Sequence, residues 1–504
     1  AAAPVVNSIN RYDPFNQKTG ATSVTYRVTF SQAVTGVDAA DFALTTTGTV
    51  TGTVSSVTQL SGFAYNVTVG SLVNSGTVRL DLKSSGTGIV SGGVPVAGGF
   101  TSGQTYSRAT LAWINPISGG LWSGEPNWDG GIIADGLNSV PVFGNFDLTA
   151  NNTVFLDTPR TVSGMTFGDA NPASPASWTI DPGNSGSTLT LAVPTGVPVV
   201  TVNALGTNAT ATIAAPVGSA NGLSKAGAGT LVLASQNSYG GATSIANGTL
   251  RVAPNGSLST TTMDLAAVSG TQLNVAGGTL TASGLVTVNS ATNVSLIVDS
   301  GTANFNGGLR NSNNDGATIR VNGGTLNTTT VTLQRGSYTT GTPSYSTGFI
   351  VAGGTANVSG AIGLGTNNSS SSMSVEGGTL NVGGTITVGN QATATRGGAL
   401  RVTSGVFNST DTVNGIVLSR TNGANANNVS FATFSGGTST VQKFTLGFDS
   451  TVNAGSATLA LSGGTLYVGS GGIVKKGTSG FTTAVNLSGG TLGAAGSWST
   501  SHPI

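Results

Sequence analysis

The chain has 504 residues, among them 78 glycines, 16 prolines and no cysteine, and its formal net charge is +1. Glycine without a Gly-X-Y period excludes a collagen triple helix, and 38% hydrophobic residues in clear alternation argue against disorder. Only 7% of the residues are charged, so the basic field of a nucleic-acid-binding protein is not expected, and the lack of cysteine excludes disulfides and thiolate metal sites.

Residues 1–108 are expected to form a β-sandwich. Strand-like stretches of about 6 to 8 residues alternate with turn residues there, as in SVTYRVTF, FAYNVTVG and GTVRLDL. The phrase YRVTFSQAVTGVDAADF resembles the immunoglobulin-like modules of bacterial surface proteins. Asp38 and Asp41 within it are a weak candidate for a Ca²⁺ site. Two carboxylates fall short of the about 6 to 8 oxygens that Ca²⁺ takes, so a turn cap is the favoured interpretation.

Residues 109–145 are expected to be a junction that caps a solenoid. Three tryptophans lie close together in this segment: Trp113, Trp122 and Trp128. Large aromatic rings can cover the open end of a solenoid, where backbone groups would otherwise be unpaired. The alternative is a platform on which sugar rings stack.

Residues 146–504 are predicted to form a parallel β-solenoid. A Gly-Gly-Thr phrase or its Ser-Gly equivalent recurs with gaps of 23 to 32 residues, which is typical of stacked repeats that share one core. The second residues of these pairs are Gly278, Gly301, Gly324, Gly354, Gly378, Gly405, Gly437, Gly464 and Gly490.

One copy of the repeat predicts the shape of a turn. The stretch SMSVEGGTLNVGGTITVGN around Gly378 contains three alternating segments separated by glycine-rich corners, which indicates three strands per coil. Because side chains alternate across a strand, one set of apolar residues is expected to point inward. That set is Val375, Leu380, Val382, Ile386 and Val388.

Five successive copies carry asparagine two residues after the corner threonine: Asn304, Asn327, Asn357, Asn381 and Asn408. In a parallel stack these side chains would lie above one another, and amides one strand spacing apart can form a hydrogen-bonded ladder. The alternative is that asparagine merely tolerates a turn conformation. Both interpretations are structural.

The stretch GAGTLVLASQNSYGGATSIANGTLRV at 227–252 carries a more specific pattern. It has a Gly-Thr-Leu strand, an Asn-x-Tyr-Gly-Gly corner, a Thr-rich strand and a second Gly-Thr-Leu strand. This pattern resembles the passenger-associated transport repeat, also called the autotransporter-associated β-strand repeat. The resemblance implies a right-handed parallel β-helix that is secreted and displayed at, or released from, a Gram-negative cell surface.

The alternative of a polysaccharide-active β-helix enzyme needs several acids on one face of neighbouring coils. After residue 221 the chain has only six acids, of which Asp315 and Asp449 are two. Asp299 and Glu376 precede their corner motifs and are the candidates, although they lie three repeats apart. The single histidine, His502, is near the end of the chain. We therefore predict no catalytic residue, no cofactor and no metal.

The sequence thus predicts a non-enzymatic, secreted structural protein of the cell surface, either an adhesin or a subunit of a fibre or sheath. Its expected partners are further copies of the chain, joined head to tail, or a surface glycan or protein. Residues 1–221 hold 7 basic and 11 acidic side chains, a balance of −4, and residues 222–504 hold 11 and 6, a balance of +5. Scatter on a sparsely charged surface is the favoured interpretation of this difference, and attraction between the ends of two chains at low salt is the alternative. No apolar run approaches about 18 residues, so no transmembrane helix is expected.

Overall fold

The computed structural model describes most of the chain and places it in two compact units. The first unit is Ala1–Ala176 with Pro182–Ser187, and the second is Ser177–Asp181 with Thr188–Ile504. The described residues are 2–289, 291, 293–311, 317–334, 338–339, 342–343, 345, 348–366, 370–390, 397–420, 429–448 and 454–504.

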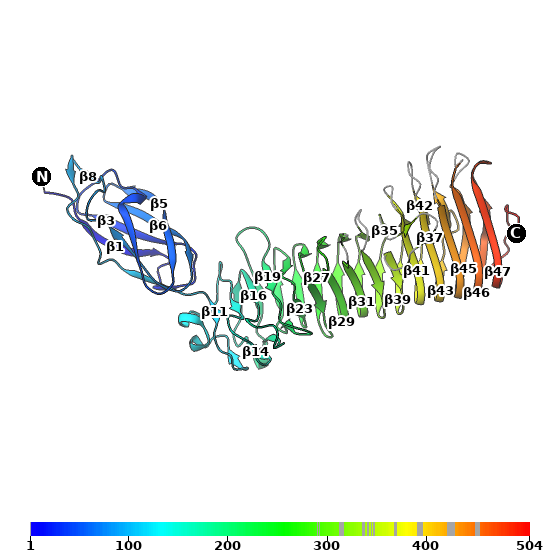
Figure 1. Cartoon of the computed structure of the whole chain (residues 1–504), viewed down its shortest axis with the longest axis horizontal. Coiled ribbons are helices and arrows are strands. Elements are labelled where there is room, and N and C mark those ends of the chain that lie inside the picture. The colour runs from blue at the N-terminus through cyan, green and yellow to red at the C-terminus, as the bar shows by residue number, and fades with distance from the viewer. Residues whose placement is uncertain are drawn as a thin grey trace. The chain divides into compact units, whose positions relative to one another are not determined.

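The first unit begins with two four-stranded sheets (Figure 1). One has the order β1 (Val6–Asp13), β3 (Val24–Phe30), β6 (Ala64–Val73) and β5 (Thr51–Ser61). The other has the order β2 (Lys18–Thr19), β10 (Thr105–Arg108), β7 (Gly76–Leu82) and β4 (Phe42–Thr46). Small additions are η1 (Ala39–Asp41), β8 (Val90–Ser91) and β9 (Val94–Pro95).

The two sheets enclose one apolar core, so this part of the chain is sandwich-like. Alternate residues of β3 are buried, including Tyr26 and Val28, and they pack with Val67, Leu80 and Tyr106 from the other strands. The sandwich expected from the sequence is therefore confirmed. The resemblance to immunoglobulin-like modules stays a prediction.

Residues 109–176 of the first unit contain short parallel strands. β11 pairs with β13, β12 with β14, and β13 with β16. Parallel stacking thus begins inside the segment 109–145. The elements here are β11 (Ala112–Trp113), β12 (Gly120–Leu121), η2 (Glu125–Asn127), η3 (Asp129–Gly131), β13 (Val142–Phe143), β14 (Asn152–Phe155), β15 (Arg160–Val162) and β16 (Gly164–Phe167), and η4 (Gly183–Ser185) completes the unit.

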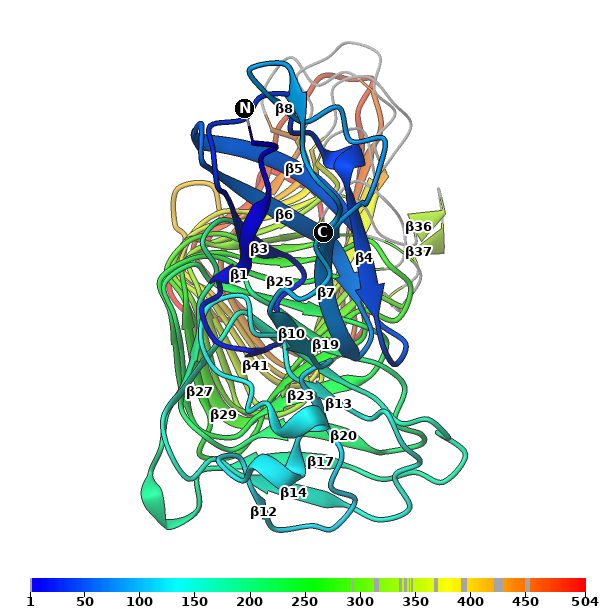
Figure 2. The ribbon, with the colours of Figure 1, turned by 90° about the vertical axis from the view of Figure 1, so that its left-hand side faces the viewer.

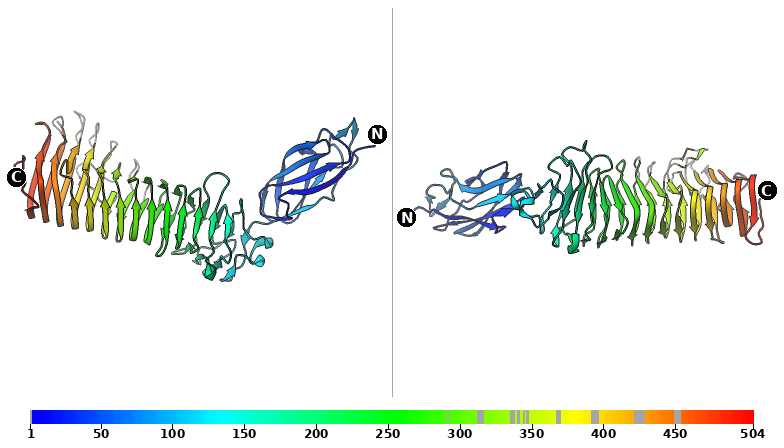
Figure 3. Two further views of the ribbon diagram at one scale, coloured as in Figure 1. Left: turned by 180° about the vertical axis from the view of Figure 1, so that it is seen from behind. Right: turned by 90° about the horizontal axis from the view of Figure 1, so that it is seen from below.

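The second unit is a parallel β-solenoid, as predicted. Strands of successive turns lie one above another when the stack is seen from the side and overlap when it is seen end-on (Figures 2 and 3). A turn made of β33 (Thr318–Val321), β34 (Thr325–Thr328) and β35 (Val331–Leu333) pairs in register with β38 (Gly348–Val351), β39 (Thr355–Val358) and β40 (Ile362–Leu364).

The strands of the solenoid form three columns. The strands that lie only in the first column are β17 (Trp178–Asp181), β20 (Thr210–Ile213), β23 (Thr230–Leu233), β26 (Thr249–Val252), β33 and β38. Strands of the second are β18 (Leu189–Leu191), β21 (Val217–Ser219), β24 (Gln236–Tyr239), β27 (Ser257–Thr260), β34 and β39. Strands of the third are β19 (Val199–Val202), β22 (Leu223–Ala226), β25 (Thr243–Ile245), β28 (Met263–Leu265), β30 (Val286–Val288), β32 (Leu309–Asn311), β35, β40, β42 (Ile386–Asn390) and β44 (Ile416–Arg420).

Several strands run through more than one column without interruption. β41 pairs with the first and second strands of its neighbours, and its register with β43 shifts around Glu376, so the corner is a bulge in one long strand rather than a break. The long strands are β29 (Gln272–Ala282), β31 (Ser295–Phe305), β41 (Ser371–Val382), β43 (Gly397–Ser409), β45 (Val429–Leu446), β46 (Ser456–Lys475) and β47 (Thr482–Ala494). A separate hairpin joins β36 (Tyr338–Thr339) and β37 (Thr342–Pro343).

The solenoid core consists of the inward residues of each turn. Val375, Leu380, Val382, Ile386 and Val388 are at most 1% exposed, which confirms the predicted alternation. Burial of each such side chain contributes about 1.5 to 3 kcal/mol. Because every turn covers the next, this core is continuous along the stack.

Close approach between turns requires glycine at the corners. Gly324 has a φ of +63°, and a Cβ atom there would lie 2.5 Å from the carbonyl oxygen of Gly301 in the preceding turn. An L-residue is disfavoured at this φ, and the neighbouring turn leaves no room for a side chain. The recurrent corner glycine therefore permits the turns to approach at the strand spacing.

Candidate functional site

The five asparagines of the repeat lie in one column on the outside of the solenoid. They are Asn304, Asn327, Asn357, Asn381 and Asn408, from β31, β34, β39, β41 and β43. These strands pair in parallel, and each asparagine after Asn304 is the register partner of the one in the preceding turn. The amides point outward because the residues on either side, such as Leu326 and Thr328 beside Asn327, point into the core.

The amide groups are linked into a hydrogen-bonded asparagine ladder. Each Nδ2 donates to the Oδ1 of the asparagine in the preceding turn. The donor–acceptor distances are 2.8 Å from Asn327 to Asn304, 2.9 Å from Asn357 to Asn327, 2.8 Å from Asn381 to Asn357 and 2.9 Å from Asn408 to Asn381. The order of donors fixes the orientation of every amide. Each ladder bond joins two turns, so the ladder cross-links neighbouring turns of the solenoid through hydrogen bonds.

An elongated groove of about 680 Å³ follows the asparagine ladder; we call it the ladder groove. The strand positions between its two walls include Phe305, Val358 and Val382, whose side chains are buried in the core. One wall is the ladder from Asn327 to Asn408 with Thr440 beyond it. The other wall is the set of residues two positions further along the chain, namely Asn306, Thr329, Ser359, Gly383, Thr410 and Gln442. None of the described residues that line the groove is charged.

The three predicted tryptophans lie together in the first unit. Trp128 packs against Trp113 and Trp122 with ring centroids 5.2 Å away in both cases, and all three rings contact Phe143. The exposed fractions of Trp113, Trp122 and Trp128 are 0%, 0% and 1%. The rings therefore form an aromatic core and offer no face on which a sugar could stack.

Each indole N–H has an acceptor. Trp113 Nε1 donates to the carbonyl oxygen of Asn115 at 2.8 Å, Trp122 Nε1 to that of Ala134 at 2.9 Å, and Trp128 Nε1 to that of Trp122 at 2.7 Å. Buried tryptophan is stable only when its polar atom is paired in this way. The proximity of the three tryptophans in the sequence predicts that they cluster, but it does not predict that all three rings are fully buried.

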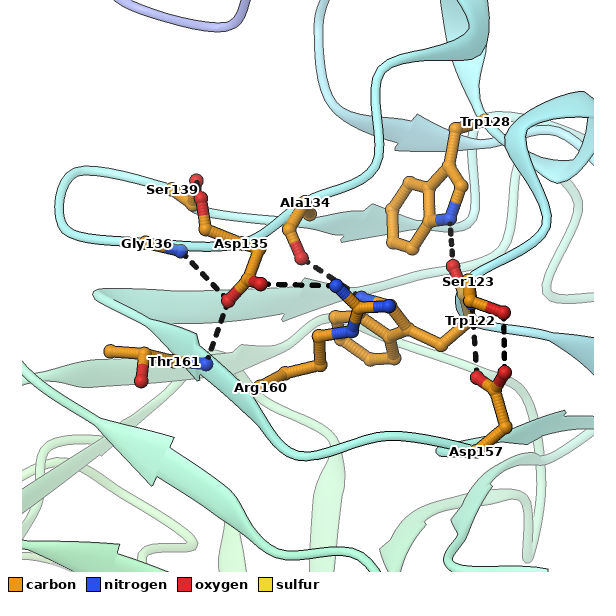
Figure 4. A network of polar contacts seen from close by, with 10 residues as sticks. All are labelled: Trp122, Ser123, Trp128, Ala134, Asp135, Gly136, Ser139, Asp157, Arg160 and Thr161. Carbon is orange, nitrogen blue, oxygen red and sulfur yellow. Dashed lines mark hydrogen bonds and ion pairs between the residues drawn. The ribbon is translucent and has the colours of Figure 1, made fainter.

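Two carboxylates beside the tryptophans hold neighbouring loops (Figure 4). Asp135 accepts hydrogen bonds from Arg160 Nη1 and from the backbone N–H of Thr161, both at 3.0 Å. Asp157 accepts from the backbone N–H of Ser123 at 3.0 Å and from its hydroxyl. Burial by itself would raise the pKa of Asp157, but the hydrogen bonds from Ser123 hold the pKa below its usual value. Both carboxylates therefore hold neighbouring loops together through hydrogen bonds.

Asp38 and Asp41 form a capping box around η1. The Asp38 carboxylate accepts from the N–H of Ala40 at 2.8 Å, and the Asp41 carboxylate accepts from the N–H of Asp38 at 2.8 Å. Burial raises the pKa of Asp41. The described residues contain no group of three or more histidine, aspartate or glutamate side chains placed to hold a metal ion. The described part of the chain likewise has no helix with the length and hydropathy of a membrane span.

Asp299 and Glu376 do not converge. Asp299 accepts hydrogen bonds from Asn274 at 3.0 Å and Asn322 at 2.7 Å, which belong to the turns on either side. Glu376 pairs with Arg401 at 2.9 Å in the next turn.

Three turns at about 4.8 Å each place the two acids about 14 Å apart along the stack. Paired carboxylates of glycosidases are separated by at most about 9.5 Å. Asp315 and Asp449 lie outside the described residues.

Lys225, which was not expected from the sequence, is fully buried in β22. It occupies an inward position between Val200 and Ile245 of the neighbouring turns. Its Nζ donates to the carbonyl oxygens of Ala226 at 3.0 Å, Gly227 at 2.7 Å and Asn247 at 2.9 Å. Burial lowers the pKa of Lys225 to about 8. The detectable sign in the sequence is a lysine at an inward position of an alternating strand.

Residues 223–252, from β22 to the end of β26, match the family model of the passenger-associated-transport-repeat. The chain carries a passenger-associated transport repeat. The resemblance seen at 227–252 is thereby confirmed. No curated protein and no solved structure matches the chain. This repeat belongs to the passenger domains of autotransporters, which are surface-displayed or secreted, and indicates a passenger-type surface protein.

Within the passenger-associated transport repeat, Asn237 is a second buried polar side chain that joins turns. It is 2% exposed, its Oδ1 accepts from the N–H of Val217 in the preceding turn at 3.2 Å, and its Nδ2 donates to the carbonyl oxygen of Ser257 in the following turn at 3.0 Å. Lys225 in β22 and Asn237 in β24 therefore join turns at different corners of two successive turns. The conspicuous asparagine of the repeat pattern has a structural role here.

Proposed function

We propose that this chain is a non-enzymatic structural protein of the cell surface, acting as an adhesin or as a subunit of an extracellular fibre or sheath. The passenger-associated transport repeat supports surface display or secretion. The solenoid supports a structural role, because its continuous core and paired strands resist local opening. Adhesion and fibre formation are both served by such a column.

The observation that carries the proposal is that outward polar groups of the solenoid are used to join turns. The asparagine ladder links five turns through four amide hydrogen bonds. Asp299 bridges Asn274 and Asn322, and Glu376 pairs with Arg401. Acids of an enzyme site would instead converge on one point with separations suited to proton transfer.

Head-to-tail association of the chains is part of this proposal. The opposite charge balances of residues 1–221 and 222–504, −4 and +5, favour contact between different parts of two molecules. The test is sedimentation velocity with negative-stain electron microscopy of the purified chain over a series of concentrations and ionic strengths. We expect linear assemblies that shorten as salt rises. Dispersed monomers at every concentration and salt level would contradict the fibre form of the proposal.

The adhesin form is tested separately. Beads coated with the chain are expected to attach to cell or polysaccharide surfaces in shear flow, and beads coated with an unrelated protein of similar charge serve as the control. Equal detachment of the two bead populations on every surface would argue against adhesion.

A further inference from the structure

The ladder groove has the form of a binding site for an extended molecule. The strands that contribute to it, β31, β34, β39, β41, β43 and β45, belong to successive turns. At about 4.8 Å per turn, the five steps between them span about 24 Å. The ladder wall presents an asparagine amide in four successive turns, whereas the residue type on the facing wall varies. A ligand that matches the ladder wall must therefore be a linear polymer with a regular repeat.

The amides of the ladder keep unused hydrogen-bonding capacity. An asparagine side chain has two N–H donors and two acceptor lone pairs on Oδ1, and each ladder bond uses one donor and one lone pair. Among the described residues, Asn327, Asn357 and Asn381 make no side-chain hydrogen bond other than those of the ladder. Each turn thus retains one donor and one acceptor, in an orientation fixed by the ladder. Vicinal hydroxyl groups, which both donate and accept, match this pattern.

The lining also selects the charge of the ligand. Its outward side chains carry amides and hydroxyls, and none of the described lining residues is cationic or anionic. A polyanion would lose hydration in the groove without gaining a counter-charge. An uncharged sugar chain presents hydroxyls to the amides and hydroxyls of the two walls.

We propose that the ladder groove binds an uncharged linear polysaccharide, laid along the solenoid with its hydroxyls against the asparagine ladder. This inference deepens the proposed adhesive role by naming a ligand class and a site. It does not depend on fibre formation, because binding is measured on the purified chain whether or not it assembles. A protein segment in the groove is the competing occupant.

The test is affinity electrophoresis and calorimetry with mixed-linkage β-glucan, xylan and glucomannan, and with polygalacturonate and heparin as charged probes. We expect at least one neutral polymer to bind and neither charged probe to do so. Ser359→Trp places a bulky side chain on the exposed rim without touching the ladder, and it is expected to weaken binding at least tenfold. The matched variant Ser404→Trp, at an exposed corner on the other side of its strand, is expected to bind as the parent does.

Three results would overturn the proposal. They are no binding of any neutral polymer, equal binding by the Ser359→Trp variant, and preferential binding of a charged probe. Co-purification of a peptide that Ser359→Trp displaces, without polysaccharide binding, would assign the groove to a protein segment instead. Near-ultraviolet and far-ultraviolet circular dichroism of both tryptophan variants verifies that the solenoid is intact. Sedimentation of the same samples separates loss of binding from loss of assembly.

Discussion

The Nδ2 atom of Asn381 donates to the Oδ1 atom of Asn357 at 2.8 Å, although the two residues are 24 positions apart in the chain. The same bond recurs between each pair of neighbouring ladder residues. A contact of this kind exists only if the turns are stacked in register. The ladder therefore connects the period of the sequence to the cohesion of the solenoid.

Removing one amide from the middle of the ladder is expected to weaken the stack. Asn357→Ala breaks two ladder bonds, each worth about 1 kcal/mol, so the free energy of unfolding in urea should fall by roughly 1 to 2 kcal/mol. Asn306→Ala, at an exposed position of the groove rim, is the control and should change it by less than about 0.5 kcal/mol. Equal effects of the two variants would show that the ladder bonds add no stability.

Lys225 is expected to make stability depend on pH. Its pKa is about 8 in the folded chain against the ordinary 10.5, so the unfolded state binds more protons between these values. The free energy of unfolding should therefore rise from pH 8 to pH 9.5, by roughly 1 to 2 kcal/mol, and show no such slope below pH 8. Above pH 10 buried tyrosines reverse the slope, because burial raises the pKa of Tyr239 and the unfolded state ionises first.

The control for this pH dependence is a pair of lysine variants. Lys225→Met is expected to abolish the slope between pH 8 and pH 9.5, whereas Lys476→Met, at an exposed position of the same unit, is expected to leave it intact. Urea unfolding at a series of pH values is the measurement. A slope that survives in the Lys225→Met variant would assign the pH dependence to another group.

A methyl group at a corner glycine is expected to disrupt two turns. Gly324→Ala places a Cβ atom 2.5 Å from the carbonyl oxygen of Gly301 at a φ of +63°, and the cost should exceed about 1 kcal/mol. Gly218→Ala is the matched control, because a Cβ there meets no atom within 4 Å. The urea midpoint should fall for the first variant and stay constant or rise for the second. A loss of stability confined to Gly218→Ala would contradict the assigned roles.

Sugars are not expected to change the tryptophan emission spectrum. Trp113, Trp122 and Trp128 are buried, and the ladder groove contains no tryptophan. The emission spectrum of the Trp498→Phe variant, which retains the buried rings, should therefore be unchanged by a panel of mono- and polysaccharides. A saturable shift of that spectrum would indicate that a sugar reaches the aromatic cluster.

No turnover of pectin-type polymers is expected. Asp299 and Glu376 are held by partners in neighbouring turns and lie too far apart along the stack to act as a pair. Release of reducing ends from polygalacturonate and xylan is the measurement. Activity that disappears in both Asp299→Asn and Glu376→Gln would establish the enzyme alternative.

Much of the fold could be predicted from the sequence because the repeat fixes which residues share a face. Val375 and Leu380 are buried, and Asn357 and Asn381 meet, as their positions in the period require. The period does not predict how deep a groove between two columns of side chains is. The ladder groove arises from how two outward columns converge, which depends on the bend between strands and not on the order of residues.

Two further features could not be read from the sequence. Lys225 is buried although lysine is normally exposed. Its ammonium group is accommodated because three carbonyl oxygens at two corners accept its hydrogen bonds. Trp122 is buried because its indole N–H reaches the carbonyl of Ala134 in a segment without regular alternation. Both depend on backbone placed by other parts of the chain.

The most direct measurement of the central claim, that the turns stack in register, is the distance between spin labels on cysteines introduced along one column. The chain has no native cysteine, and Thr302, Thr465 and Thr491 occupy equivalent positions of one column, with Thr465 six turns and Thr491 seven turns from Thr302. With about 4.8 Å per turn, double electron–electron resonance should give about 29 Å for the pair 302 and 465, and about 34 Å for the pair 302 and 491. Broad distributions, or distances that do not lengthen by one turn spacing between the two pairs, would contradict the stacked solenoid.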